Sequence, residues 1–416
     1  MSALRTAIAL VLPLMMACMH VMARPAMANV VTDWNEMTIA YVNAAGRPAP
    51  AWILDLAMVH IAMHDAIQAY QHRFETYSDP IAGAAGSVVA ATATAARDVL
   101  VSRFPAQEMA IQDAYLAYMG SKQLQVTDPG VVVGRLAALG IINLRSNDGA
   151  FPPDPEVFIG GTEPGQWRPT PPALAPMSAP WMGEVTPFAL KDVYGLLHEP
   201  PPPHLRSGLY ARDYDEVKSL GAREGSSRTP AQTSLALFYA GNYFVQMNAI
   251  ARSVAVARLP DIGDSARLLA LANLSAADAL IVSWQNKRTH NFWRPSTAIA
   301  QGDYDGNPRT AGDPSWLPLI NDPPYPDYTS GANSITSAFM RTLALFFDND
   351  AYTFTVTTTF PGQAPRTYTS FSGVADDVED ARIYLGIHFR FADQVARRQG
   401  RQAADWAFNH VLRPVE

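Results

Sequence analysis

The sequence predicts an all-α helical bundle with long proline-rich loops gathered over one side, and three observations support this fold class. Apolar residues recur at helical spacing through most of the chain. Hydrophobic residues make up 48% and charged residues 17% of the 416 residues, which suits a large packed core. Only one run, residues 352–359, is strand-like. No linker-like boundary interrupts the pattern, so we expect a single domain over residues 29–416.

The first 28 residues have the features of a secretory signal peptide. Arg5 precedes an apolar run over residues 7–17, and Ala26-Met27-Ala28 resembles a cleavage site. The run is too short to anchor the chain, and no later stretch shows the ~20 consecutive apolar residues of a membrane-spanning helix. We therefore expect an exported protein, periplasmic or secreted, without a transmembrane segment after cleavage.

Cys18 is the only cysteine and lies inside this signal segment. A lipoprotein attached through Cys18 is the lesser alternative to soluble export. After cleavage the chain would hold no thiol, which excludes a disulfide framework, a cysteine nucleophile and a cysteine-ligated metal.

The periodicity predicts helices in order along the chain. They cover residues 50–71, 87–103, 106–119, 131–144, 231–256, 265–292, 333–347 and 375–410. Residues 149–187 contain ten prolines and cannot be helical, so they form a long covering loop of the kind that carries function. Residues 199–203 end in four successive prolines and form a second rigid connector.

Charge and simple motifs exclude several functions. The net charge is −7, and no basic run is interleaved with aromatic residues, so no nucleic-acid partner is expected. His60 and His64 stand at a spacing that can bind zinc, but Ile61 occupies the position where a zinc protease has Glu. We interpret both histidines as packing or hydrogen-bonding residues of a core helix.

Three segments of the C-terminal half, about residues 265–411, contain the candidate catalytic and anion-binding residues. In the first, Lys287 and Arg294 are seven residues apart and are expected on one helix face with Trp284 and His290, ending at Pro295. In the second, a proline-rich approach containing Tyr325 reaches Ser330-Gly331 at the start of a helix, where an anion is favoured. In the third, Arg382 and His388 flank a glycine.

These residues resemble a known signature. Lys287-x6-Arg294-Pro295, then Ser330-Gly331, then Arg382-x5-His388 is similar to the three-part motif of the vanadium-dependent haloperoxidases and the type-2 phosphatidic acid phosphatases. Trp284, Tyr325-Pro326-x-Tyr328 and residues 386–391 resemble the bacterial haloperoxidase branch, as do residues 55–60 and 161–171 upstream. The likeness covers most of the chain after the signal.

The resemblance implies a role for each motif residue. Lys287, Arg294 and Arg382 would neutralise the oxygens of vanadate or phosphate, and Ser330 with the Gly331 N–H would hydrogen-bond them. His388 would be the axial vanadium ligand in a peroxidase, or the nucleophile in a phosphatase, which needs no cofactor. Trp284 and Tyr325 would form the pocket wall.

The sequence departs from the family where Ser-Gly-His is usual, because Ala332 replaces the acid–base histidine. A missing proton donor costs roughly 10²–10⁴ in rate, which would spare bromide and iodide oxidation more than chloride oxidation. His290 is the candidate substitute. The phosphatases also place Asp four residues after the axial histidine, where this chain has Ala392 followed by Asp393, so the orienting partner of His388 stays open.

Three functions therefore remain. The first is an exported haloperoxidase-like enzyme that contains vanadate and acts on halide and hydrogen peroxide. The second is an acid phosphatase or other phosphoester hydrolase, and the third is a non-catalytic oxyanion-binding protein. The resemblance also implies a homodimer.

Overall fold

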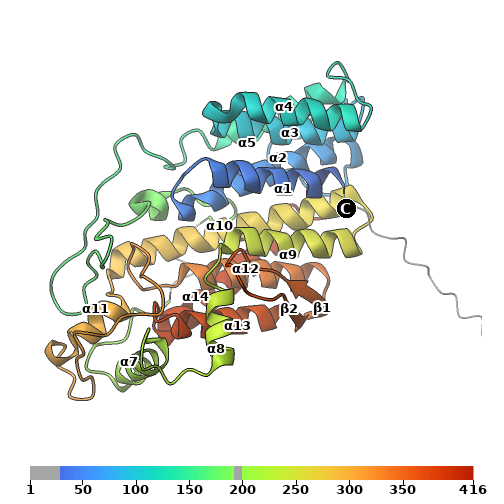
Figure 1. The fold of residues 1–416 in the computed structure, drawn as a ribbon. Helices are drawn as coiled ribbons and strands as arrows, with labels where there is room; N and C mark the ends of the chain where they lie inside the picture. Colours follow the sequence, from blue (N-terminus) through green and yellow to red (C-terminus); the bar gives the residue numbers. More distant parts are fainter. Residues whose placement is uncertain (1–28, 192–198, 416) are drawn as a thin grey trace, which may run out of the picture.

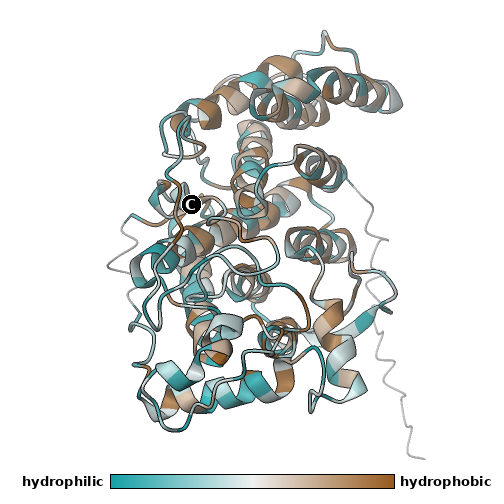
Figure 2. Ribbon diagram, turned by 60° about the vertical axis from the view of Figure 1, so that its left-hand side comes forward, coloured by the Kyte–Doolittle hydropathy of each residue, from teal (hydrophilic) through white to brown (hydrophobic). Residues whose placement is uncertain are grey.

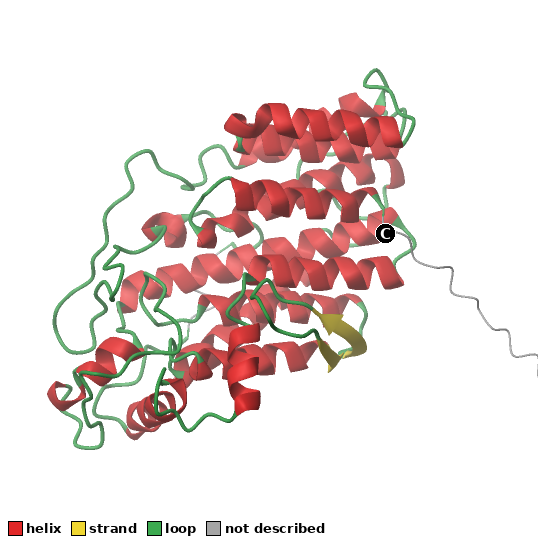
Figure 3. Cartoon of the chain, viewed as in Figure 1, coloured by secondary structure: helices red, strands yellow, loops and turns green. Residues whose placement is uncertain are grey.

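The computed structural model describes residues 29–191 and 199–415, which form an all-α bundle as predicted (Figure 1, Figure 3). The expected signal segment, with Cys18, lies outside these residues. The N-terminal helices are α1 (Val30–Ala44), α2 (Trp52–Gln71), α3 (Val88–Arg103), α4 (Glu108–Ser121) and α5 (Gly130–Leu144). The later helices are α7 (Gly208–Gly221), α8 (Pro230–Phe238), α9 (Tyr243–Arg258), α10 (Ile262–His290), α11 (Pro295–Ala300), α12 (Gly331–Phe346), α13 (Phe371–Tyr384) and α14 (Arg390–His410).

Helix α10 is the central element of the bundle. It packs against α2 on the N-terminal side and against α12 and α14 on the C-terminal side, and every residue from Ser265 to Trp284 is buried. Contrary to the expectation from the sequence, α10 is long and apolar enough to cross a membrane by length and composition. Its apolar window is, however, entirely buried inside the protein, as in the core helix of a bundle. The outer helices alternate polar and apolar residues around their surfaces, which fits one buried face each (Figure 2).

Two of the predicted helices are interrupted. The periodicity over 231–256 contains a break at residues 239–242, where Asn242 accepts hydrogen bonds from the Phe244 and Val245 N–H groups and starts α9. The pattern over 375–410 breaks at residues 385–389. There Gly386 has a φ of +79°, and a Cβ on it would lie 2.5 Å from the Gly221 carbonyl oxygen. Apolar spacing continues across both breaks, so periodicity alone predicts one helix.

The strand-like run pairs with a segment that the sequence analysis left unassigned. Strand β1 (Ala351–Val356) and strand β2 (Arg366–Ser370) form a two-stranded antiparallel sheet, with Phe354 opposite Tyr368. Helices α1 and α7 were also not predicted. The start of α1 carries a recognisable signal, since Asn29 and Thr32 form a capping box.

His60 and His64 are buried residues of α2, as the sequence analysis interpreted them. The Nε2 atom of His60 lies 2.8 Å from Nδ2 of Asn35, and Nε2 of His64 lies 3.0 Å from the Glu75 carbonyl oxygen. Burial lowers the pKa of His60 to about 3 and that of His64 to about 4, so both are neutral. Within residues 29–191 and 199–415, no group of three or more His, Cys, Asp or Glu side chains could hold a metal ion.

The loops gather at the end of the bundle where α10 terminates (Figure 3). The covering loop over residues 149–187 contains only the short 3-10 helix η3 (Pro180–Glu184). It is pinned by backbone hydrogen bonds to the segment that follows α10, from Trp167 N–H to the Asn291 carbonyl (2.8 Å) and from Trp293 N–H to the Gly165 carbonyl (2.9 Å). This loop therefore covers the part of the chain that carries the first sequence motif, which contains Lys287 and Arg294.

The segment directly after the covering loop is fixed to α10 by one buried carboxylate, that of Asp278. It accepts hydrogen bonds from three successive backbone N–H groups, those of Phe188 (2.6 Å), Ala189 (2.8 Å) and Leu190 (2.9 Å). Burial raises the pKa of Asp278 to about 6, although these three hydrogen bonds act in the opposite direction. Between about pH 4 and 6 the folded chain keeps a proton that the unfolded chain has released, so the free energy of unfolding falls as the pH rises through this window.

Asp278→Asn is expected to destabilise the protein by about 1–3 kcal/mol, because one amide oxygen cannot satisfy three buried donors. The variant should also lose the Asp278 contribution to the pH dependence between about pH 4 and 6. Urea unfolding at both ends of this window measures both effects. Asp264→Asn, in the first turn of the same helix, is the control and should cost less than about 1 kcal/mol. Equal pH slopes for wild type and Asp278→Asn would contradict the prediction.

Candidate active site

Lys287 is the first of three buried cations of the site and binds residues 326 and 327. It projects from the last turn of α10 and is 0% exposed. Its Nζ donates hydrogen bonds to the carbonyl oxygens of Pro326 (2.7 Å) and Asp327 (3.1 Å), and it lies 4.9 Å from the centre of the Tyr325 ring. Burial, and then the charge of Arg294, hold the pKa of Lys287 well below its usual range.

Arg294 reaches the same segment by a different route from the one predicted. Helix α10 ends at His290, not at Pro295, because Asn291 adopts the left-handed conformation (φ 45°) and turns the chain. Arg294 is extended (ψ 155°), as a residue before proline prefers, and Pro295 begins α11. Lys287 and Arg294 therefore do not share a helix face, and the expectation from helical spacing is wrong. They converge because both bind the backbone of residues 325–327.

The Arg294 side chain is fully buried and links this segment to His388. Its Nε donates to the Tyr325 carbonyl (2.8 Å) and its Nη1 to the Ile387 carbonyl (2.7 Å). Nη1 also lies 3.2 Å from Nε2 of His388. The remaining guanidinium nitrogen, Nη2, is buried without a hydrogen-bond partner.

Arg382 is the third cation and comes from the last turn of α13. It is 2% exposed, donates to the Tyr243 hydroxyl (3.1 Å) and to the Tyr239 carbonyl, and leaves Nε buried without a partner. After burial, the charges of Arg294, Lys287 and Arg382 are the causes that hold the pKa of His388 well below its usual range. The structure thus brings the three predicted cations together around the predicted axial histidine.

His388 lies in the break between α13 and α14 and is 3% exposed. Its Nδ1 lies 2.7 Å from Oδ1 of Asp327. The two atoms are within ion-pair distance but lack hydrogen-bond geometry. A carboxylate beside a neutral imidazole favours the tautomer with its proton on Nδ1, which leaves the Nε2 lone pair facing Arg294. Nε2 is therefore the atom that would bind vanadium or attack phosphorus.

Asp327 is the functional residue that the sequence analysis missed. The orienting partner of His388 was sought just after the histidine, whereas Asp327 lies about sixty residues before it, between Tyr325-Pro326 and Tyr328. Burial raises its pKa to about 7, against the opposing charges of Arg294 and Lys287. The only sign of Asp327 in the sequence was its position as an acidic residue within the aromatic, proline-rich segment that precedes Ser330-Gly331.

Asp327→Asn tests the orienting role. A carboxylate on Nδ1 raises the basicity of a histidine ligand, and losing such a partner typically costs 10–100-fold in affinity. We expect orthovanadate, which would bond to His388, to bind about 10–100-fold more weakly. Orthophosphate needs no such bond and should bind equally well or better, because a negative group has been removed. Calorimetric titration with both anions measures this split, and a parallel loss of both affinities would indicate a merely structural role.

Ser330 and Gly331 stand at the N-terminus of α12, as predicted. Ser330 is the N-cap residue, yet its hydroxyl makes no capping hydrogen bond. That hydroxyl lies 3.4 Å from Nδ2 of Asn333, which also donates to Oδ1 of Asp393 (2.8 Å). Burial holds the pKa of Asp393 well above its usual range, and the charge of Arg382 acts against this. Asp393 therefore belongs to the Ser330 side of the site and does not pair with His388.

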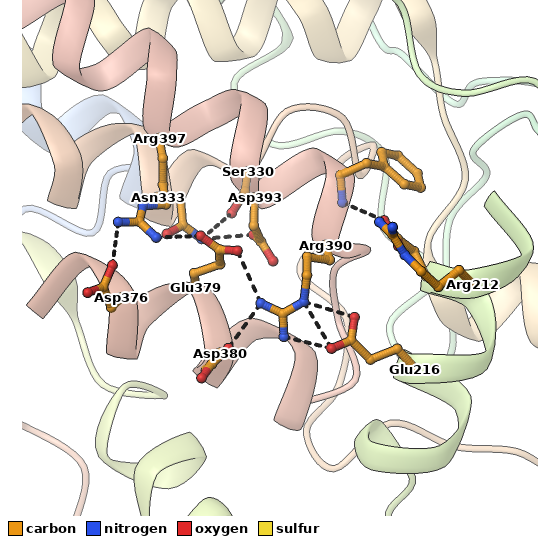
Figure 4. A network of polar contacts seen from close by, with 12 residues as sticks. Arg212, Glu216, Ser330, Asn333, Asp376, Glu379, Asp380, Arg390, Asp393 and Arg397 are labelled. Carbon is orange, nitrogen blue, oxygen red and sulfur yellow. Dashed lines mark hydrogen bonds and ion pairs between the residues drawn. The ribbon is translucent and has the colours of Figure 1, made fainter. Parts of the chain in front are cut away.

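A partly buried network of ion pairs holds the start of α14 in place (Figure 4). Arg390 contacts Glu216 of α7 (2.8 Å), and Glu379 (3.1 Å) and Asp380 (3.0 Å) of α13. Glu379 also pairs with Arg397 of α14 (2.5 Å). The segment that carries His388 is thereby held between three helices.

The chemistry of this site fits an oxyanion. Three cations are buried together, while burial raises the pKa of Asp327 to about 7 and that of Asp393 well above its usual range. Arg294 Nη2 and Arg382 Nε are buried without a hydrogen-bond partner, and α12 begins at Gly331, where free backbone amides favour an anion. A tetrahedral anion would supply the missing charge and acceptors, and Nε2 of His388 offers the axial bond.

His290, Trp284 and Tyr325 occupy different parts of this region. The half-buried His290 ring packs edge-on against Tyr328 at 5.2 Å between ring centres, at the end of α10. Trp284 and Tyr325 pack together, with ring centres 4.8 Å apart, and both line a cavity of about 190 Å³. Gly331 and Ala332 belong to the same wall, so the residue that replaces the family's histidine faces this cavity.

Comparisons with known proteins agree with this geometry. Residues 267–416 match the family described as the VCPO second helical-bundle domain. The vanadium chloroperoxidase of Curvularia inaequalis is 30% identical over 205 residues, which are 41% of this chain and 32% of that protein. The match therefore spans about a third of the length of this curated relative.

The fold is shared with solved bacterial structures. A bacterial vanadium-dependent iodoperoxidase superposes with a TM-score of 0.77 at 23% identity and covers 94% of this chain and 100% of its own. A holo-type bacterial vanadium-dependent chloroperoxidase gives a TM-score of 0.71 at 18% identity and covers 93% and 98%. An apo-type one gives 0.69 at 18% identity and covers 87% and 93%.

Fold and site together define an all-α bundle built around a buried, cationic oxyanion site with one neutral histidine. Residues 267–416 match the VCPO second helical-bundle domain, and the described chain has the fold of solved bacterial vanadium-dependent haloperoxidases.

Proposed function

We propose that the chain is an exported haloperoxidase-like enzyme that contains vanadate and oxidises halide, preferably bromide or iodide, with hydrogen peroxide. The observation that carries the proposal is His388, whose Nε2 lies 3.2 Å from Arg294 Nη1, whose pKa is lowered by the charges of three buried cations, and whose Nδ1 lies 2.7 Å from Asp327. In the family, vanadate bound at such a histidine activates peroxide toward halide without a redox change at the metal. A homodimer in the periplasm or outside the cell is part of the proposal and rests on the resemblance alone.

Each residue has a separate task in this proposal. Lys287, Arg294 and Arg382 neutralise the anion and orient its oxygens, with Ser330 and the Gly331 N–H as further donors. Asp327 keeps the His388 proton on Nδ1, so that Nε2 can bond to the anion. The covering loop and the aromatic wall exclude water, which strengthens each of these charge interactions.

The halide preference rests on Ala332. A methyl group cannot donate or accept a proton, so the more demanding oxidation of chloride would suffer most from the lost acid–base histidine. Iodide and bromide are easier to oxidise and would be spared more.

One feature favours a phosphoester hydrolase as the second candidate. A neutral His388 with a free Nε2 lone pair is poised as a nucleophile, and attack on phosphorus would form a phosphohistidine. The leaving group would, however, lack the proton donor that Ala332 replaces. The third candidate is a non-catalytic oxyanion-binding protein. It would use the same cations to bind the anion, and the loss of the acid–base histidine would have removed its turnover.

The deciding experiment uses the chain from Asn29, stripped of metal and titrated with orthovanadate while bromide or iodide oxidation by peroxide is followed. Activity proportional to bound vanadate supports the haloperoxidase. Phosphoester hydrolysis that vanadate inhibits, without halide oxidation, supports the hydrolase. Vanadate binding without either activity supports the non-catalytic protein.

Neighbouring cations on α10 provide a matched pair of variants for this assay. Lys287 is buried in the site, whereas Arg288 is partly exposed and pairs with Glu156 and Glu184. Lys287→Gln should weaken vanadate binding at least about 10-fold, and Arg288→Gln should leave it unchanged. Equal effects would show that vanadate binds elsewhere.

His290 is the proposed substitute for the missing acid–base group. His290→Ala should lower the rate of halide oxidation by about 10²-fold without changing the affinity for vanadate. The rate at saturating vanadate, followed against pH, separates the two quantities and should lose one titration limb. An unchanged pH profile would assign the proton transfer to another group.

A further inference from the structure

Helix α5 has an apolar face that stays exposed in the part of the chain that the structure describes. The helix lies at the outer edge of the bundle and packs its other side on α3 and α2 (Figure 1), with Ala137 and Ile141 among its buried residues. On the outer side Val132, Leu136 and Leu139 are 48–57% exposed. A helix that is apolar on all sides is normally buried on all sides, so this outer face is expected to have a partner.

The exposed residues have the spacing of a coiled-coil seam. They follow one another at intervals of four, three and four residues, as Val132, Leu136, Leu139 and Asn143. These are successive d, a, d and a positions of a heptad repeat, which places all four on one narrow stripe that fits a second helix. A single asparagine at an a position fixes the register and the number of strands, and in a parallel pair Asn143 would face its own counterpart. The stripe is therefore suited to a second copy of α5.

Two charges beside the stripe are complementary between parallel copies. In a parallel pair, the g position of one helix lies beside the following e position of the other, and here these positions are Arg135 and Gly140. Ser78 packs where Gly140 lacks a side chain, since a Cβ on Gly140 would lie 2.8 Å from the Ser78 Oγ. The next residue, Asp79, is exposed and lines a groove of about 570 Å³ together with Leu136 and Gly140. Asp79 therefore takes the place of the missing e-position side chain.

Arg135 and Asp79 are both exposed, and neither forms an ion pair within the described part of the chain. Arg135 acts on Asp98 of α3 only at a distance. Burial raises the pKa of Asp98, the charges of Arg97 and then Arg135 oppose this, and the direct ion pair of Asp98 is with Arg97 (2.6 Å). A lipid surface would be the alternative occupant of an apolar face, but the acidic Asp79 beside the stripe and the polar Asn143 within it disfavour a lipid surface.

We propose that the outer face of α5 binds α5 of a second copy of this chain, in parallel about a two-fold axis. A two-fold contact is isologous, so each Arg135 meets the partner's Asp79 and the charge pair forms twice. A contact of two heptads is at the small end of specific interfaces, and we expect a dimer that dissociates in the micromolar range. The inference names the interface of the homodimer that forms part of the proposed function and rests on that part alone. It does not depend on the chemistry at His388.

Sedimentation velocity of the chain from Asn29, over about 1–100 μM, measures the dissociation constant of the dimer. Leu136→Glu places a charge in the middle of the seam and should weaken the dimer at least about 10-fold. Met109→Glu is the matched control, because Met109 is an exposed apolar residue of α4 outside the stripe, and this variant should dimerise like the wild type. Both variants should bind orthophosphate with unchanged affinity, which shows that the fold and the anion site are intact.

A charge exchange tests how the two copies are oriented. Arg135→Glu and Asp79→Lys each bring two like charges together across the interface, and each should raise the dissociation constant about 10-fold. The double variant restores an opposite pair in reversed order and should dimerise nearly as tightly as the wild type. All three variants should keep the orthophosphate affinity of the wild type.

The outcomes separate this inference from the proposed function. A dimer that Leu136→Glu dissociates, and that the double charge variant restores, supports the parallel α5 interface. Dissociation by Leu136→Glu without recovery in the double variant overturns the parallel arrangement. A dimer that Leu136→Glu leaves unchanged overturns the interface, while the homodimer of the proposed function stands. A chain that stays monomeric at about 100 μM overturns both, including one that instead binds vesicles of zwitterionic and anionic phospholipid. Failure to oxidise halide would contradict the proposed chemistry and leave the dimer contact standing.

Discussion

Ala332→His should raise the rate of halide oxidation by up to about 10²-fold, because general acid–base catalysis contributes about 10²–10⁴-fold and His290 supplies about 10² of it. Ala332 is the second residue of α12, adjacent to Gly331, and its side chain faces the cavity of about 190 Å³. The gain should be largest for chloride, whose oxidation depends most on the missing group.

The measurement for Ala332→His is the turnover number at saturating vanadate, for chloride and iodide, across pH 5–8. A new titration limb near the ordinary histidine pKa of about 6.5 should accompany the gain. Ala332→Asn is the matched control, since it adds a polar side chain that cannot transfer a proton. Equal rates for the two variants would contradict the prediction and assign proton transfer to His290 or another group.

The fold class could be predicted from the sequence because amphipathic periodicity survives in nearly every helix. The failures occur where the backbone turns without interrupting that periodicity. Asn291 leaves α10 in a left-handed conformation, and Gly386 ends the α13 segment because Gly221 approaches too closely for a side chain. Close tertiary approaches of this kind leave no trace in hydrophobic spacing. Strand β2 was missed for a similar reason, since its identity depends on its partner.

For the site, too, the sequence predicted which residues take part but not how they are arranged. The identity of the three cations could be read from motif spacing, but the reason for their convergence could not. Lys287 and Arg294 meet through the carbonyl groups of residues 325–327 and not through a shared helix face. Asp327 could not be assigned because its partner, His388, is distant in sequence and close only in the fold. Spacing within a motif therefore predicted the residues, and packing between motifs determines what each one does.

His388→Ala should abolish vanadate-dependent halide oxidation, a loss of at least about 10³-fold, and any phosphoester hydrolysis with it. Every candidate activity uses Nε2 of this residue, which faces Arg294 at 3.2 Å while Nδ1 is held by Asp327. The buried cations remain in the variant, so orthophosphate should still bind. Orthovanadate should bind no more tightly than orthophosphate, because the axial bond is gone.

The pH dependence of the wild type provides a second check on His388. Burial and three cations hold its pKa well below the usual range, so the imidazole stays neutral as the pH falls through 6.5. The affinity for vanadate should therefore show no loss that follows histidine protonation near that pH. His204→Ala, an exposed histidine outside the site, is the control for the substitution and should retain full activity. If His388→Ala still oxidised halide in proportion to vanadate, the anion would be bound without the axial histidine, and the assignment of Nε2 would be wrong.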